Sequence, residues 1–184
     1  HKQNALSIVQ QQLSKKRSTP LVAQAPVYYT LIGNPNATED IQRICAGKNH
    51  NNHDHNNNNN GECHQLRNVE QGDEGLTLQS LWEYCQTQDH TDHLVTYIHD
   101  KGSFHPSERN DKLRIMLTEA VFSNECKTIN NNNNKCNICS ARFSPIPHYH
   151  MPGNMWTAKY RYVKHLIAPN QFSSRMDDLV EYVL

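Results

Sequence analysis

The sequence lacks the long hydrophobic runs and the one-sided charge that would assign it to a membrane or to nucleic acid. No stretch of its 184 residues is apolar enough for a membrane span, and no signal peptide is visible. Lys and Arg (18) balance Asp and Glu (18), which gives no electrostatic reason to expect nucleic acid as a partner. The chain begins with His1 rather than Met. We therefore expect a piece of a longer protein, which leaves room for a membrane anchor upstream.

Two asparagine-rich tracts, at 49–60 and 130–134, are too polar to pack into a core. Subtracting them leaves roughly 140 residues for globular structure, which predicts one domain. Residues 1–25 are polar with scattered Leu and Val, and we expect a solvent-exposed helix or a disordered leader there. The predicted domain then covers residues 26–184. The histidines among the first asparagine tract favour a low-complexity insertion over a metal site.

Strand-like and helix-like segments alternate along the rest of the chain. β-branched and aromatic runs predict strands, and apolar residues at helical spacing predict helices. The alternation predicts an α/β layered fold with right-handed crossovers. The expected strands are 27–32, 63–69 and 94–98, and the expected helices are 38–45, with Thr38 near its cap, 77–85 and 107–122.

The strand expected at 94–98 ends in the polar sequence His99-Asp100-Lys101-Gly102. Titratable side chains at the carboxyl end of a buried strand occupy the place where open α/β sheets bind ligands. A lysine that precedes a glycine suits a diphosphate, because the backbone can approach the ligand closely there. The alternative is that His99 bonds a loop carbonyl and Lys101 is a solvated turn residue.

A second polar segment precedes an expected helix near the C-terminus. Pro152-Gly153 predicts a turn, and Asn154 is the expected N-cap of a helix that carries Trp156 and Tyr160 on one face. Such a helix start offers N–H donors and a positive dipole end to an anionic ligand. A purely structural cap is the commoner meaning of this pattern.

These two segments together resemble a glycosyltransferase-like family. Its motifs, Tyr-Ile-His-x-Lys-Gly and His-x-x-Gly-Asn-(aromatic)-Trp-x-Ala, match residues 97–102 and 150–158, and the resemblance extends more weakly from 27 to about 172. It implies a Rossmann-like (GT-A-like) layered sheet with flanking helices, incomplete at the C-terminus, and transfer of a sugar from a nucleotide-sugar donor to an acceptor hydroxyl on a glycan or protein.

The sequence departs from that family at several points. Met155 and Thr157 stand where the family tends to carry aromatic residues, and no Asp-x-Asp metal motif is present. The chain also stops at Leu184, before the acidic and Trp-containing segment that the family usually shows. No metal ligand is therefore assigned, and the need for a divalent cation such as Mn²⁺ or Mg²⁺ stays open.

The resemblance and the residue chemistry together give a set of site residues. His99 or Asp100 is the expected base for the acceptor hydroxyl. Arg114 is expected to contact phosphate, with surface charge as the alternative, and Trp156 is expected to stack on a sugar or base, with core packing as the alternative. The expected substrate-binding residues are Lys101, Gly102, Asn110, Arg114, His150, Gly153, Asn154 and Trp156.

The six cysteines allow two interpretations. Cys136-x-x-Cys139 with Cys126 and His148 or His150 would make a zinc site, and the same cysteines would otherwise join disulfides, which we favour slightly. A glycosylation sequon beginning at Asn36 agrees with the secretory pathway, in the Golgi or the ER lumen. The alternative function is a non-catalytic binding module stabilised by zinc or by disulfides.

Overall fold

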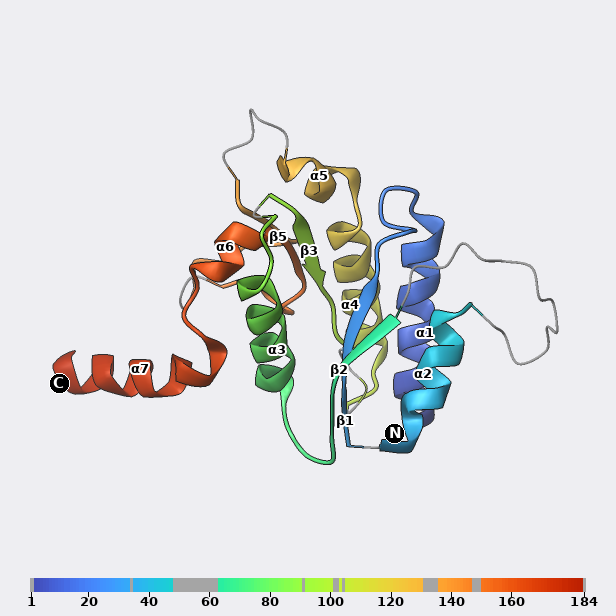
Figure 1. The fold of residues 1–184 in the computed structure, drawn as a ribbon, viewed down its shortest axis with the longest axis horizontal. Helices are drawn as coiled ribbons and strands as arrows, with labels where there is room; N and C mark the ends of the chain where they lie inside the picture. Colours follow the sequence, from blue (N-terminus) through green and yellow to red (C-terminus); the bar gives the residue numbers. More distant parts are fainter. Residues whose placement is uncertain are drawn as a thin grey trace.

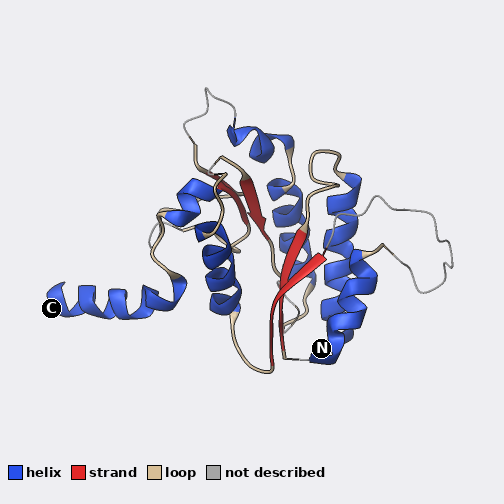
Figure 2. Ribbon diagram, viewed as in Figure 1, coloured by secondary structure: helices blue, strands red, loops and turns tan. Residues whose placement is uncertain are grey.

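The computed structural model describes residues 2–33, 35–47, 63–90, 92–100, 103, 105–130, 136–146 and 150–183. These residues form a mixed α/β structure in which helices flank two small sheets (Figures 1 and 2). The helices are α1 (Lys2–Ser18), α2 (Thr38–Cys45), α3 (Glu74–Gln86), α4 (Glu108–Val121), α5 (Asn124–Lys127), α6 (Tyr160–Lys164) and α7 (Pro169–Val183). The strands are β1 (Val27–Ile32), β2 (Cys63–Val69), β3 (Leu94–Tyr97), β4 (Ile138–Cys139) and β5 (Trp156–Lys159).

The first sheet holds β1 and β2 in parallel, and the second holds the antiparallel order β3-β5-β4. In the first sheet Val27 pairs with Cys63 and Ile32 with Val69. In the second, Tyr97 pairs with Trp156. The strands expected at 27–32, 63–69 and 94–98 are thus confirmed, as are the helices that follow each of them.

The central strand β5 is buried on both faces, and its side chains alternate between two helical layers. Met155 and Thr157 face α4, where Met155 packs with Leu117 and the Thr157 hydroxyl donates to the Val121 carbonyl at 2.9 Å. Trp156 and Ala158 face α3 and α6 in a second apolar cluster. Successive side chains of a strand point to opposite faces, so every second residue contacts the same helical layer. A third cluster joins α1 and α2 to the first sheet.

The helix that the sequence predicts from Asn154 does not form. Asn154 and Gly153 have φ values of 45° and 88°, so the chain turns there and continues as β5. Only from Tyr160 does it become helical, as α6. The spacing of Trp156, Tyr160 and Val163 resembles a helical period, but pairing with β3 fixes the first part as a strand. Thr38 likewise does not cap α2, whose N-cap is Ala37 without a side-chain bond.

The expected leader at residues 1–25 is part of the packed fold. Residues 2–18 form α1, and one side of this helix is buried through Ile8, Gln12, Leu13 and Lys16. The Gln12 amide, although buried, is satisfied because it donates to the His99 carbonyl at 2.9 Å. The helix expected as one alternative for this segment is confirmed, but it is packed along one side and is not a solvent-exposed leader.

The C-terminal helix α7 projects from the body of the protein (Figure 1). It is attached at its start, where the Asn170 backbone N–H donates to the Gln79 side chain of α3 at 3.0 Å. None of the helices in the described part of the chain has the length and apolar character needed to cross a membrane.

Candidate binding site at the carboxyl end of β3

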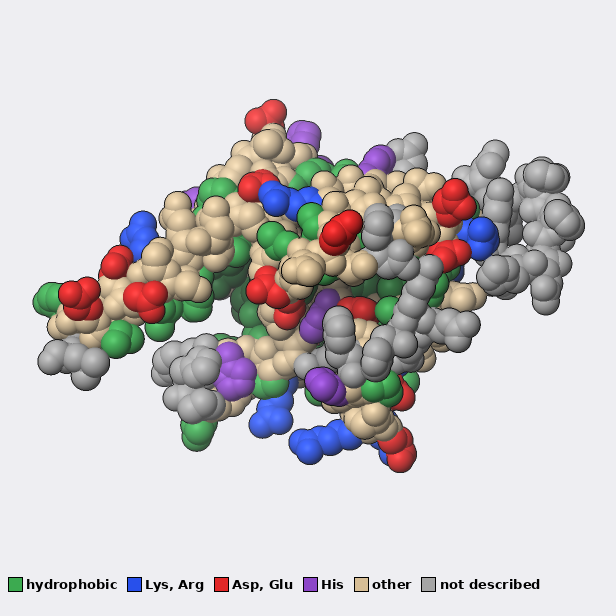
Figure 3. Space-filling model, turned by 90° about the horizontal axis from the view of Figure 1, so that it is seen from below, with side chains coloured by type: hydrophobic (Ala, Val, Ile, Leu, Met, Phe, Trp, Pro, Cys, Tyr) green, Lys and Arg blue, Asp and Glu red, His purple; other side chains and the backbone are tan. Residues whose placement is uncertain are grey.

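A cavity of about 1190 Å³ separates the two sheets. Strands β1 and β3 both line it, and so do Glu74, His99 and Asp100 near the carboxyl end of β3, which we call the mouth of the cavity. Figure 3 looks from below onto this side of the molecule and shows histidine and acidic side chains close together near the centre of the face. Most of the cavity wall is apolar, with a few convergent polar groups, which is the character of a small-molecule site.

Glu74 is the residue that connects the polar groups at the mouth. It is the first residue of α3, whose N-cap Asp73 accepts from the Gly75 backbone N–H. The Glu74 Oε1 accepts from the Tyr97 hydroxyl at 2.9 Å and from the Asn154 Nδ2 at 2.8 Å. It thereby ties α3, β3 and the turn before β5 to one another.

His99 lies beside this carboxylate and makes two long-range contacts of its own. Its Nδ1 is 3.7 Å from the Glu74 Oε1, and its Nε2 is 3.0 Å from the Gly153 carbonyl oxygen. A carbonyl only accepts, so Nε2 carries the hydrogen in this contact. The imidazole therefore joins the end of β3 to the Gly153-Asn154 turn, and the two motif segments meet.

The aromatic residues of the second sheet form the floor next to this cluster. The Tyr97 and Trp156 rings have centroids 5.5 Å apart, and the Trp156 Nε1–H donates to the Asn154 Oδ1 at 3.2 Å. Burial, with the Glu74 carboxylate nearby, raises the pKa of Tyr97, which keeps its hydroxyl a neutral donor. Trp156 is only 6% exposed and is a core anchor, so the sugar-stacking role expected for it is not available.

The remaining expected site residues separate into two groups. Asp100 and Asn110 line the cavity, and the Asn110 amide donates to the His105 carbonyl at 2.7 Å. Arg114 is 5% exposed and lies between α4 and α1, where it contacts Asp111 and Gln11. Arg114 therefore faces away from the position where it was expected to contact phosphate.

One expected residue lies away from the cluster, and two are not described. His150 pairs through its backbone with Ser144, in an isolated β-bridge outside the cavity lining. Lys101 and Gly102 lie outside the described residues.

The sequence motifs did not point to Glu74, although a local signal for it exists. Asp73-Glu74 follows the expected strand at 63–69 after the short segment Glu70-Gln71-Gly72 and opens an apolar-periodic helix. Open α/β sheets bind ligands at the carboxyl ends of their strands, so the acidic residues after the strand 63–69 were also candidate site residues. Its partners Tyr97 and Asn154, 23 and 80 residues away, could not be read from the sequence.

The Gly153 turn that meets His99 leaves no room for a side chain. A Cβ added to Gly153 would overlap the Leu117 side chain, which is buried in the core, and the φ of 88° disfavours any L side chain. We expect Gly153→Ala to destabilise the protein by about 2 kcal/mol, from the cost of a non-glycine residue with positive φ together with the overlap. Urea unfolding measures this.

The same substitution in a Leu117→Ala background separates the two causes. Removing the Leu117 side chain relieves the overlap and leaves only the backbone cost, so the penalty of Gly153→Ala should be smaller there. Equal stability of wild type and Gly153→Ala would contradict the turn geometry.

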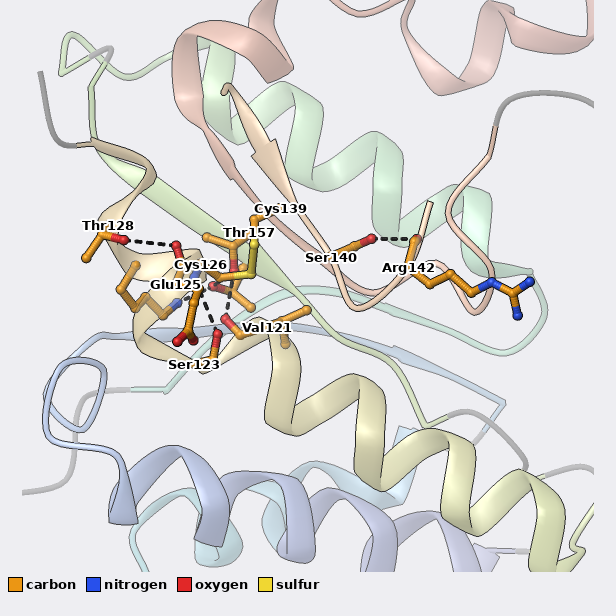
Figure 4. The surroundings of a disulfide bond; sticks show 11 residues. Val121, Ser123, Glu125, Cys126, Thr128, Cys139, Ser140, Arg142 and Thr157 are labelled. Carbon is orange, nitrogen blue, oxygen red and sulfur yellow. Dashed lines mark hydrogen bonds between the residues drawn. A yellow bond between two sulfur atoms is a disulfide. The ribbon is translucent and has the colours of Figure 1, made fainter. Parts of the chain in front are cut away.

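Two disulfides are present, between Cys45 and Cys63 and between Cys126 and Cys139. The second joins α5 to β4 next to the bond from Thr157 to the Val121 carbonyl (Figure 4). Since Cys126 and Cys139 are bonded to each other, neither is a zinc ligand, and the alternative of a zinc site at Cys126, Cys136 and Cys139 is excluded. Within the described chain, no three His, Cys, Asp or Glu residues form a metal-binding group.

The disulfides bracket the two asparagine-rich tracts. The first bond spans the tract at 49–60 and the second spans the one at 130–134. These tracts lie outside the described residues, apart from Asn130, which ends a short 3-10 helix. Disulfides are typical of proteins in an oxidising, secreted-type environment, and the expected disulfides are confirmed.

The two remaining cysteines differ sharply in exposure. Cys85 is fully buried, and burial raises the pKa of its thiol to about 11, whereas Cys136 is exposed and takes part in neither disulfide. We expect a thiol reagent at neutral pH to label Cys136 in the native protein and Cys85 only on unfolding, because the thiolate is the reactive form. Labelling followed by peptide mass spectrometry measures this, and rapid labelling of Cys126 or Cys139 would contradict the pairing.

The comparisons with known proteins identify a family without assigning it an activity. Residues 1–183 match the family model described as "Domain of unknown function (DUF8361)", and the chain belongs to this family. No curated protein and no solved structure matches the chain. The matched region includes α1 and α7 as well as the residues that line the cavity.

Proposed function

We propose that the protein is a glycosyltransferase-like domain that moves a sugar from a nucleotide-sugar donor to an acceptor hydroxyl. The observation that carries this proposal is the contact of His99 with Gly153. These residues lie 54 positions apart and belong to the two motif segments on which the family resemblance depends. Two motifs that serve one reaction have to lie at one site: residues 97–100 of the first motif line the cavity, and Gly153 and Asn154 of the second contact the lining residues His99 and Glu74.

The strand arrangement supports a Rossmann-like (GT-A-like) form of the fold. Strands β1, β2 and β3 end on the same side of the molecule (Figure 1), and β1 and β3 face each other across the cavity. Placing the two sheets in series gives the order β2-β1-β3-β5-β4, with β5 antiparallel to both of its neighbours. Ligands of such sheets bind beside the carboxyl ends of the parallel strands.

In this proposal Asp100 takes the proton of the acceptor hydroxyl, because Asp100 lines the cavity just beyond the carboxyl end of β3. His99 is a positioning residue, since its Nε2 is engaged with Gly153 and its Nδ1 faces Glu74. Asn110 and Asn154 are the candidate hydrogen-bonding groups for the sugar. With Arg114 buried, Lys101 is the remaining expected cation for the leaving diphosphate.

The described residues do not supply a metal site at the mouth, so no step is assigned to Mn²⁺ or Mg²⁺. The partners in the proposal are a nucleotide-sugar donor and a glycan or protein acceptor. The proposed location is the lumen of the Golgi or the ER, where both the disulfides and such donors would be found.

A transfer assay on the full-length protein with a panel of nucleotide sugars tests the proposal. We expect turnover with at least one donor and a loss of about a hundredfold or more in Asp100→Asn, as for removal of a general base. Asp89→Asn is the matched control, because Asp89 is exposed and lies outside the cavity lining. No turnover and no nucleoside-diphosphate binding would refute the proposal.

A disulfide-stabilised module that binds a glycan without transferring it is the second candidate. The burial of Arg114 favours it, because the mouth then has fewer cations to stabilise a leaving diphosphate. Saturable binding of a glycan without turnover of any donor would select this candidate over the transferase.

A further inference from the structure

Two lysines line the cavity on the side of α1 and α4: Lys16 of α1, which is buried, and Lys127 at the end of α5, which is half-buried. Glu74 lies on the opposite side, at the start of α3. The two lysines are therefore a part of the cavity separate from the carboxylate cluster at its mouth.

Lys127 is bound only through neutral groups among the described residues. Its Nζ donates to the Thr96 Oγ1 at 2.7 Å and lies 5.6 Å from the centre of the Phe122 ring. The Thr157 hydroxyl donates to a carbonyl, so it must accept from Thr96, and Thr96 in turn accepts from Lys127. In this series of hydrogen bonds Lys127 is a donor, and only one of the three N–H groups of its ammonium is used.

Lys16 is in a similar situation. It is 7% exposed, and its Nζ donates to the Ala23 carbonyl at 2.9 Å. Val22, next to Ala23, packs in the same apolar cluster as Phe122. Both ammonium groups thus approach the wall that Val22 and Phe122 form.

A buried positive charge without an anionic partner is costly to hold in a protein. Burial lowers the pKa of both lysines, and that of Lys127 falls to about 8. Exposed lysines on α1 and α4 differ, since Lys15 pairs with Glu119 and Lys112 pairs with Glu108. A ligand that brought negative charge to either ammonium group would offset this desolvation cost.

We propose that Lys16 and Lys127 form an oxyanion subsite that binds a phosphate or carboxylate group of the molecule that occupies the cavity. The inference does not depend on sugar transfer, because it concerns the charge of the ligand and not its reaction. Lysine serves as a point charge toward such groups.

Competitive labelling of lysines with acetic anhydride at a series of pH values tests the subsite in the unmodified protein. We expect Lys127 to react with a midpoint near pH 8 when no anion is present. Inorganic phosphate should move this midpoint to higher pH, because a bound anion stabilises the ammonium form. Acetate in a parallel series separates the two sources: a larger shift with phosphate assigns a phosphate group, and a larger shift with acetate assigns a carboxylate.

Calorimetry with inorganic phosphate on substituted proteins gives the second readout. Lys127→Met and Lys16→Met keep the length of the side chain and should each weaken phosphate binding on the order of tenfold or more, as for a lost bond to a charged group. Lys15→Met, one residue away and exposed, should bind like wild type. An unchanged Lys127 midpoint in both anions, or equal binding by all three variants, would overturn the subsite. A negative transfer assay would leave it intact.

Discussion

Replacement of Glu74 by alanine is expected to destabilise the protein by about 3 kcal/mol and to abolish ligand binding in the cavity. The substitution removes the acceptor of the Tyr97 hydroxyl and of the Asn154 amide together. The Tyr97 side chain is buried, and a buried donor without an acceptor costs about 1–3 kcal/mol. The Asn154 turn then loses its tie to α3, and His99 loses the carboxylate beside it.

A double-mutant cycle with Tyr97→Phe isolates the hydrogen bond. Tyr97→Phe should cost less in the Glu74→Ala background than in wild type, by about 1 kcal/mol. Glu83→Ala is the control on the same helix, because Glu83 is a surface residue paired with Arg67 and should cost under about 1 kcal/mol. Additive losses in urea unfolding would mean that Glu74 does not organise the site.

Removal of either disulfide is expected to cost about 3 kcal/mol, the amount that a chain-entropy model gives for loops of this size. The bonds span 18 and 13 residues. Cys126 is 2% exposed and lies under the second sheet, so the paired substitution Cys126→Ala with Cys139→Ala also leaves a small void in the core. Each bond fixes both ends of an asparagine-rich tract that cannot hold itself in place by packing.

Chemical denaturation of the paired alanine variants measures these losses, with Cys136→Ala as the matched control. The control should unfold at the wild-type midpoint, because Cys136 is exposed and takes part in neither disulfide. A variant without a disulfide that unfolded at the wild-type midpoint would contradict the stabilising role given to that bond.

Local patterns predicted the elements whose own residues carry a clear strand-forming or helical pattern. The β-branched run before Gly33 gave β1, and the apolar face that includes Leu117 and Val121 gave α4. Pairing of distant segments decided the rest. Residues 156–159 follow a helical spacing, yet they lie between β3 and β4 and form a strand buried on both faces.

The role of α1 was missed for the same reason. Its sequence is polar, and burial of polar residues requires partners that the sequence does not place nearby. Gln12 meets the His99 carbonyl across 87 positions, and Lys16 meets Ala23 at the entrance to β1. The candidate site was predicted in part: His99, Gly153 and Asn154 do meet, but the carboxylate that links them was found only in the structure.

The most direct test of the account is an NMR titration of the full-length protein with nucleoside diphosphates, followed on labelled side chains. The account predicts saturable shifts of the His99 imidazole and the Asn154 amide signals at the mouth of the cavity, with His165 on the exposed surface of α6 unchanged. Shifts that leave His99 and Asn154 unaffected, or that concentrate elsewhere on the molecule, would contradict it.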